Sequence, residues 1–240
     1  MIILPVFLLA GFIKGVIGLG LPTVAMGLLG VVMPPAEAAA LLIVPSAVTN
    51  IWQMLTGGRL GALTRRLWPM LTGVCLGTWA GGGLLARDPT GHAATALGAA
   101  LILYAVVGIA APRLSLSARQ EAWTGPLVGA VTGLITAATG VFVIPAVPYL
   151  QAIGLEKEEL VQALGLSFTV STLALAVGLA QDGVLGLDIA GASLLALAPA
   201  LAGMAIGQWL RSRISAAAFR RCFFLGLSAL GGYLVLRGVI

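Results

Sequence analysis

Eight long apolar stretches occupy nearly the whole chain. Six of them are close to the roughly 20 residues that cross a bilayer as one helix. Only 9% of the residues are charged, whereas soluble domains have about a quarter. A membrane barrel would show short segments of alternating hydrophobicity, so we expect an all-α polytopic membrane protein. The stretches are Ile2–Gly30, Ala36–Thr56, Leu67–Ala86, His92–Ala111, Trp123–Gln151, Leu160–Ala180, Leu187–Leu210 and Ala216–Leu236.

The first and fifth stretches are longer than the others and are interrupted in the middle. Glycine permits backbone conformations that break a helix, and proline removes a helical hydrogen bond. We therefore expect these two stretches to be broken helices or re-entrant hairpins, and the other six to be full spans. The interrupting residues are Gly15, Gly18, Gly20 and Pro22 in the first stretch, and Gly133, Gly140 and Pro145 in the fifth.

The two halves of the chain repeat each other. The glycine-rich segment Gly11–Pro22 recurs in kind at Gly129–Gly140. The spacing Pro-x3-Gly-x3-Gly-x-Trp occurs at Pro69–Trp79 and again at Pro199–Trp209. Such duplication is typical of secondary transporters. It predicts a first membrane repeat at residues 1–112, a connecting loop at 113–122 and a second repeat at 123–240.

The basic residues outside the stretches indicate a topology. If all eight stretches cross fully, six basic residues fall on each side; if the first and fifth are hairpins, ten share one side and only Arg87 and Arg237 lie opposite. The positive-inside rule favours the second count, with the ten in the cytoplasm and the two repeats inverted. The net charge of +5 thus reflects topology rather than nucleic-acid binding. The ten are Arg59, Arg65, Arg66, Arg113, Arg119, Lys157, Arg211, Arg213, Arg220 and Arg221.

Lys14 is an ionisable residue inside the first glycine-rich segment. An ionisable group at membrane depth is costly and suggests a function. Free backbone N–H groups at a broken helix also favour an anion, so Lys14 predicts a small-anion site near the midplane, where the two hairpin tips meet. Two structural alternatives are that Lys14 snorkels to an interface, or that it pairs with Glu37 or Asp182.

Neutral polar residues in other stretches can complete such a site. Amide and hydroxyl donors bind oxyanions without burying a second charge. The alternative for each is an interhelical hydrogen bond, which is common for Ser and Thr in membranes. The predicted substrate-binding residues are Lys14, Gly15, Gly18, Gly20, Thr49, Asn50, Gln53, Thr136, Thr139, Gly140, Ser171 and Thr172.

Other classes of function find less support. The sequence has no nucleophile with a plausible base, no metal-ligand spacing and one histidine, so we expect neither an enzyme nor a metal or cofactor. The leading interpretation is a permease for small anions that works by alternating access. An anion channel and a non-transporting membrane assembly subunit are the alternatives. Proton coupling and a homo-oligomer remain open.

The glycine pattern also resembles that of a known family. Gly11–Gly20 reads GxxxGxxGxG, and Gly129–Gly140 reads GxxxGxxxxxxG with Pro145 shortly after. Together with the eight apolar stretches, which span nearly the whole chain, these motifs resemble the TauE/SafE family of sulfite exporters and related anion permeases. The resemblance implies transport of sulfite, sulfoacetate or other organosulfonates. It also implies a multi-pass protein of the cell membrane, which in a bacterium is the inner membrane.

Overall fold

The computed structural model describes residues 2–88, 92–110, 115–211 and 213–239. All regular secondary structure in these residues is helical. The helices are α1 (Ile3–Ile17), α2 (Leu21–Leu29), α3 (Pro35–Leu55), α4 (Leu60–Ala80), α5 (His92–Ala110), α6 (Ala118–Thr139), α7 (Ala146–Ala152), α8 (Lys157–Gln181), α9 (Leu187–Leu210) and α10 (Ala216–Val239).

The helices overlap the apolar stretches, with differences at their ends. The largest is at α4, which begins seven residues and ends six residues earlier than the expected stretch Leu67–Ala86. The first stretch forms α1 and α2, and the fifth forms α6 and α7. Five described helices, α3, α5, α8, α9 and α10, are long and apolar enough to cross a membrane. We expected six; α4 is as long as α3 but is not among the five, and its first turns carry Arg65 and Arg66. Residues 118–122 of the expected connecting loop belong to α6, and residues 113 and 114 lie outside the described residues.

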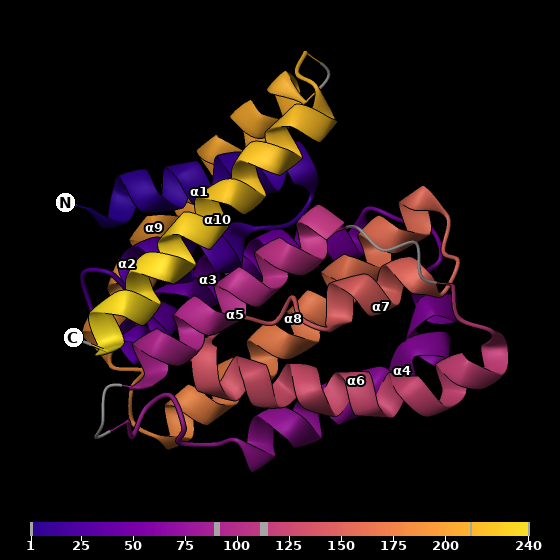
Figure 1. The fold of residues 1–240 in the computed structure, drawn as a ribbon, viewed down its shortest axis with the longest axis horizontal. Coiled ribbons are helices and arrows are strands. Elements are labelled where there is room, and N and C mark those ends of the chain that lie inside the picture. Colours follow the sequence, from indigo (N-terminus) through magenta and orange to yellow (C-terminus); the bar gives the residue numbers. More distant parts are fainter. Residues whose placement is uncertain (1, 89–91, 111–114, 212, 240) are drawn as a thin grey trace.

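Helices from the two halves of the chain are interlocked (Figure 1). The most extensive helix contacts join α1 to α9, α4 to α6, α5 to α10, and α3 to α8. Each of these pairs takes one helix from residues 1–112 and one from residues 118–239. The duplicated glycine-rich segments begin in α1 and α6, and the duplicated Pro-x3-Gly-x3-Gly-x-Trp motifs lie in α4 and α9. The α1–α9 pair therefore corresponds to the α6–α4 pair, and the same packing occurs twice.

Glycines let the backbones of these pairs touch. A Cβ on Gly203 of α9 would lie 2.0 Å from the carbonyl oxygen of Leu8, and one on Gly77 of α4 would lie 2.1 Å from that of Ala130. In the reverse direction, a Cβ on Gly11 would lie 2.1 Å from the carbonyl oxygen of Ala200. Small residues at helix crossings give this close approach in membrane proteins. The duplicated Pro-x3-Gly-x3-Gly-x-Trp motif therefore forms the two equivalent helix crossings.

Pro45 interrupts the hydrogen bonding of α3 beside α9. Proline has no N–H, so the carbonyl of Leu41, four residues earlier, loses its helical donor. The hydroxyl of Ser193 on α9 donates to that carbonyl at 2.8 Å and accepts from the N–H of Val44 at 3.2 Å. Ser193 is 1% exposed. A side chain from the second half of the chain thus supplies the hydrogen bond that proline removes from a helix of the first half.

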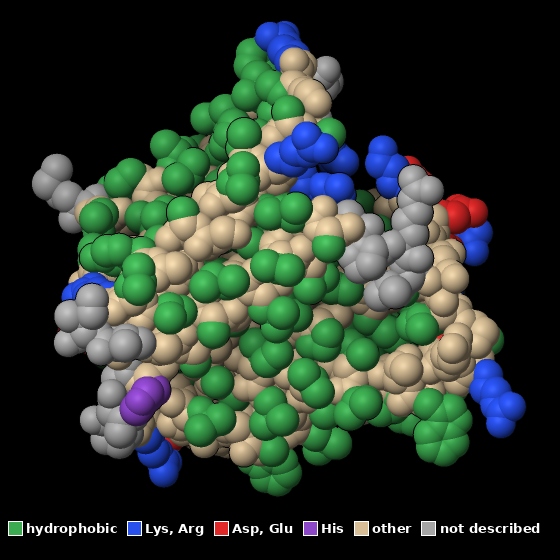
Figure 2. Space-filling view, viewed as in Figure 1, with side chains coloured by type: hydrophobic (Ala, Val, Ile, Leu, Met, Phe, Trp, Pro, Cys, Tyr) green, Lys and Arg blue, Asp and Glu red, His purple; other side chains and the backbone are tan. Residues whose placement is uncertain are grey.

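The outer surface carries many large apolar side chains. Figure 2 shows them across the broad middle of one face, with Lys and Arg gathered toward the margins. Leu187 is 93% exposed and Trp123 is 80% exposed. Extended apolar surface of this kind is unsuited to water and suited to lipid.

Candidate functional site

Both interrupted stretches break at a glycine in the left-handed region. Gly18 follows α1 with φ of 85°, and Gly20 precedes α2 with φ of 110°. Gly140 follows α6 with φ of 70°. At the two helix ends the glycine N–H donates back to the helix, from Gly18 to the Lys14 carbonyl and from Gly140 to the Thr136 carbonyl. Left-handed backbone is costly for other residues, which explains glycine at these three positions.

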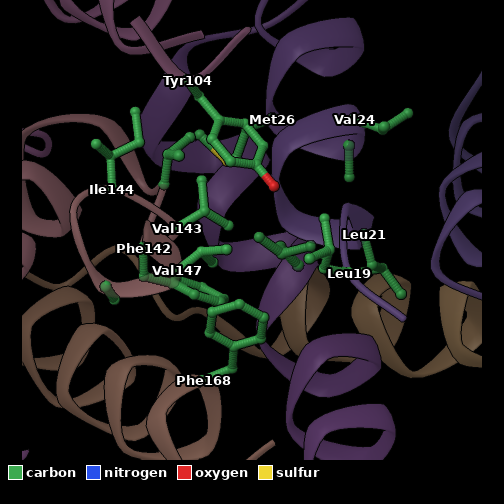
Figure 3. Close-up of a cluster of buried hydrophobic side chains, with 14 of the residues drawn as sticks. Leu19, Leu21, Val24, Met26, Tyr104, Phe142, Val143, Ile144, Val147 and Phe168 are labelled. Atoms are coloured by element: carbon green, nitrogen blue, oxygen red, sulfur yellow. The ribbon is translucent and has the colours of Figure 1, made fainter. Parts of the chain in front are cut away.

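The two breaks lie close together inside the protein. A Cβ on Gly140 would lie 3.0 Å from the sulfur of Met26 on α2 and 3.4 Å from the Cβ of Ala39 on α3. Figure 3 shows side chains from both segments packed together with Tyr104 and Phe168; those labelled are Leu19, Leu21, Val24 and Met26 from the first segment and Phe142, Val143, Ile144 and Val147 from the second. All the labelled side chains are buried. The two broken segments therefore share one hydrophobic cluster.

A chain of polar contacts crosses the interior next to the first break. The Nζ of Lys14 donates to Oδ1 of Asn50 on α3. The Nδ2 of Asn50 then donates to the hydroxyl of Thr172 on α8 at 3.2 Å. Exposure is 3% for Lys14, 0% for Asn50 and 1% for Thr172. Three predicted site residues from three helices are thus brought into direct contact.

The surroundings of Lys14 argue against both structural alternatives. A snorkelling lysine reaches water, whereas Lys14 is buried. Asp182 instead forms an ion pair with Arg87 at 3.0 Å, and Glu37 is exposed near the start of α3. Within the described residues Lys14 has no ion pair, and its hydrogen-bond acceptor is a neutral amide. Its position in the last turn of α1 is electrostatically favourable, because the end of a helix carries partial negative charge.

Gln53 holds the first break in place. Its Nε2 donates to the carbonyl of Gly18 at 3.1 Å and to the carbonyl of Val161 on α8 at 3.0 Å. Asn50 and Gln53 are three residues apart, so they share a face of α3. Through these two amide side chains, that face of α3 contacts α1, the turn that follows α1, and α8.

The remaining predicted residues have more local contacts. Thr49, Thr136 and Thr139 each donate their hydroxyl to a carbonyl of their own helix. The hydroxyl of Ser171 is buried without a partner among the described residues. A Cβ on Gly15 would lie 2.3 Å from the Met204 carbonyl oxygen, so Gly15 packs against α9.

Sequence reasoning missed two buried polar residues near this region. Gln162 donates to the carbonyls of Met54 at 2.8 Å and Gly57 at 2.9 Å, which satisfies the end of α3. Ser193 bridges the Pro45 defect as described above. An amide inside the apolar run of α8 was a visible signal for Gln162. The partner of Ser193 is 152 residues away, which no local pattern indicates.

The comparisons with known proteins identify the family. The family model described as Sulfite exporter TauE/SafE matches residues 3–234. The chain belongs to the TauE/SafE family. This is a family of membrane transporters rather than enzymes. Together with the membrane-compatible helices, membership makes the chain a multi-pass membrane protein. No match was found among curated proteins or among solved structures.

Proposed function

We propose that this TauE/SafE protein is a secondary transporter of a small sulfur-containing anion, either sulfite or an organosulfonate such as sulfoacetate. The substrate binds near Lys14 between two inverted repeats, and alternating access exposes it to each side in turn. The observation that carries this proposal is the buried ammonium group of Lys14 beside a helix break, hydrogen-bonded to a neutral amide. Family membership supports the class of substrate.

The repeated packing supports inverted repeats. The α1–α9 and α4–α6 pairs use equivalent glycines and equivalent backbone contacts. Asn50 and Thr172 lie equally far from the starts of α3 and α8, since each is the sixteenth residue of its helix, and they hydrogen-bond to each other. A contact between matching positions is what a pseudo-two-fold axis produces, and inverted repeats place substrate sites on such an axis.

The charge distribution supports two hairpins. Arg59 pairs with Glu159, and Arg66 pairs with Glu121 and donates to the Ile153 carbonyl. The starts of α4, α6 and α8 and the residues after α7 therefore share one end of the molecule. Arg237 donates to the carbonyl of Val31, which follows α2. Arg237 also lines a surface pocket with residues 30–36, 85, 86 and 88. We assign the first end to the cytoplasm by the positive-inside rule and propose a bacterial inner membrane as the location.

The contacts of Lys14 leave capacity for an anion. An ammonium group has three N–H donors, and one of them is directed to Asn50. Nearby helices carry buried hydroxyls without partners among the described residues, including Ser46 one turn before Asn50 and Ser171 next to Thr172. An oxyanion accepts several such bonds at once. The Lys14–Asn50 bond is then the anion-free arrangement of the site.

A binding panel tests the proposal. Purified protein would be heated with sulfite, sulfoacetate, taurine, thiosulfate and simple carboxylates, because a ligand that binds the folded state raises its apparent stability. We expect a sulfur oxyanion to raise the melting temperature of the wild type and not that of Lys14→Ala. Arg213→Ala, which also removes one positive charge, serves as the control. Wild-type affinity in folded Lys14→Ala would refute the role of Lys14.

A further inference from the structure

A second group of cations lies near the first break but outside the Lys14 site. A pocket of about 250 Å³ is lined by Lys157, Arg211 and Arg220. Its wall includes Ile17 and Leu19, the residues on either side of Gly18. Ile17 is three residues after Lys14, or about 4.5 Å along the axis of α1. The pocket therefore reaches from the arginine-rich end of the protein to the turn next to Lys14.

The cations of this pocket are not neutralised by neighbouring acids. All three are exposed, and in the part of the chain that the structure describes none has an ion pair. No acidic side chain is among the described lining residues. Two of the acids near Lys157 are engaged elsewhere, since Glu156 caps α8 and Glu159 pairs with Arg59 at 3.4 Å. Glu158 is exposed and is not among the residues that line the pocket. Three like charges around one cavity attract anions.

The position of Lys157 adds to this charge. Lys157 is the first residue of α8. The start of a helix carries partial positive charge, so a cation there is unfavourable for the helix itself. An anion in the adjoining pocket would be attracted both by the ammonium group and by the helix end.

Within the described residues, Tyr104 places a hydroxyl without a partner beside this pocket. Its side chain lines the same pocket and is 2% exposed. Its hydroxyl has no hydrogen-bond partner among the described residues. Figure 3 shows this hydroxyl pointing into the cluster that contains Leu19 and Leu21. A buried hydroxyl without a partner is costly. Leu19 belongs both to that cluster and to the pocket wall, so an oxyanion that displaces Leu19 would accept the hydrogen bond of Tyr104.

Apart from the three cations, the Gln151 amide and Tyr104, the side chains that line the pocket are apolar. Val107, Leu160 and Phe224 line it together with the cations. A bare inorganic anion gains nothing from such walls, whereas a short carbon chain gains from contact with them. The lining therefore suits an organic anion with a sulfonate group and a small apolar body.

We infer that this pocket is a recruitment site, in which an organosulfonate binds before it passes the Gly18 turn to Lys14. The inference rests on the proposed transport function. Gln53 forms the boundary between the two sites, because it holds the carbonyl of Gly18 and that of Val161, which also lines the pocket. Passage requires those two hydrogen bonds to open.

Binding kinetics test the inference. The triple variant Lys157→Gln/Arg211→Gln/Arg220→Gln would be compared with Arg65→Gln/Arg119→Gln/Arg213→Gln, which removes the same charge from residues that do not line the pocket. Stopped-flow tryptophan fluorescence with sulfoacetate gives the association rate. We expect about a tenfold slower association and a weaker salt dependence for the pocket triple, because steering by charge is screened by salt. Equal rates in the two triples would overturn the inference.

A second measurement does not depend on transport. Val107→Cys in a Cys75→Ser/Cys222→Ser background would be labelled with two methanethiosulfonate reagents, one carrying a sulfonate and one a trimethylammonium group. We expect the sulfonate reagent to react faster, with a rate ratio that falls at least about fivefold in the pocket triple and little in the control triple. A ratio that does not change contradicts the inference. If the wild type binds none of the panel anions while the ratio behaves as expected, the transport proposal fails and the charged pocket stands.

Tyr104→Phe tests the hydroxyl separately. Tyr104 packs edge-on against Phe224 with ring centroids 5.2 Å apart, and phenylalanine keeps this packing. We expect apparent sulfoacetate affinity to fall by about threefold to tenfold, the effect of one lost hydrogen bond. Unchanged affinity in a folded Tyr104→Phe protein would remove Tyr104 from the recruitment site.

Discussion

The Nζ of Lys14 donates its hydrogen bond to Oδ1 of Asn50, and both side chains are buried. Asn50 in turn donates to Thr172 in the second half of the chain. One asparagine thus connects the only lysine of the first broken stretch to the opposite half of the chain. Whatever changes the position of Asn50 must change the contacts of Lys14.

The first prediction concerns the loss of this acceptor. Asn50→Leu leaves the Lys14 ammonium buried without its partner, and we expect the free energy of unfolding to fall by about 1–3 kcal/mol. Thr172→Val removes only a neutral partner of Asn50 and should cost less. Thermal unfolding in detergent measures both.

A double substitution shows whether the cost arises from the unpaired ammonium. Lys14→Met in the Asn50→Leu background removes both polar groups, which is often nearly neutral for a buried pair. We expect its melting temperature to return toward that of the wild type, while binding of sulfur oxyanions is lost as in Lys14→Ala. A double variant less stable than Asn50→Leu alone would contradict this explanation.

The second prediction concerns the glycine crossings. Gly203→Ala would place a Cβ 2.0 Å from the Leu8 carbonyl oxygen, so α1 and α9 must separate. Gly77→Ala would do the same to α4 and α6. We expect each to lower stability by at least about 2 kcal/mol, the usual range for a core overpacked at a rigid contact.

Gly191→Ala is the matched control in the same helix. A Cβ at this position would meet nothing within 4 Å, so only helix propensity changes. Alanine is favoured over glycine by about 1 kcal/mol inside a helix. Equal melting temperatures for Gly191→Ala and Gly203→Ala would show that the crossing is looser than described.

The third prediction is a double-mutant cycle on α3. Ser193→Ala leaves the Leu41 carbonyl without a donor and should cost about 1–3 kcal/mol. Pro45→Ala restores a backbone N–H that can donate to Leu41, so Ser193→Ala should cost less in that background. Thermal unfolding of the four proteins gives the coupling energy. Additive effects would mean that Ser193 does not compensate for Pro45.

Local patterns predicted much of this fold because they report on the backbone. Each apolar stretch overlaps one or two helices, since a helix in lipid must satisfy its own N–H and C=O groups. The glycines at 18 and 140 mark breaks, since each adopts a positive φ that other residues avoid. Lys14 stood out because it is charged, and Asn50 and Gln53 because they are amides in an apolar run.

Contacts between residues that are distant in the chain could not be predicted from the sequence. The Asn50–Thr172 contact joins residues 122 apart, and the Gln53–Val161 contact joins residues 108 apart. The sequence also could not separate helix packing from ligand binding at Gly15, because glycine serves both through the same lack of a side chain. The recruitment pocket was missed for a related reason: its cations come from three segments and were interpreted only as topology determinants.

The fourth prediction concerns topology. In the Cys75→Ser/Cys222→Ser background, single cysteines at Ala36 and Gly58 should react with membrane-impermeant maleimide from opposite sides, because α3 crosses between them. Gly58 is suitable because a Cβ there meets nothing within 4 Å. If the first stretch is a hairpin, a cysteine at Val32, which follows α2 and is 51% exposed, should react from the same side as one placed near the N-terminus. Intact cells and inverted vesicles give the two accessibilities. Reaction of the Val32 cysteine from the opposite side would mean that the first stretch crosses fully, and the proposed inverted arrangement of the two halves would then be wrong.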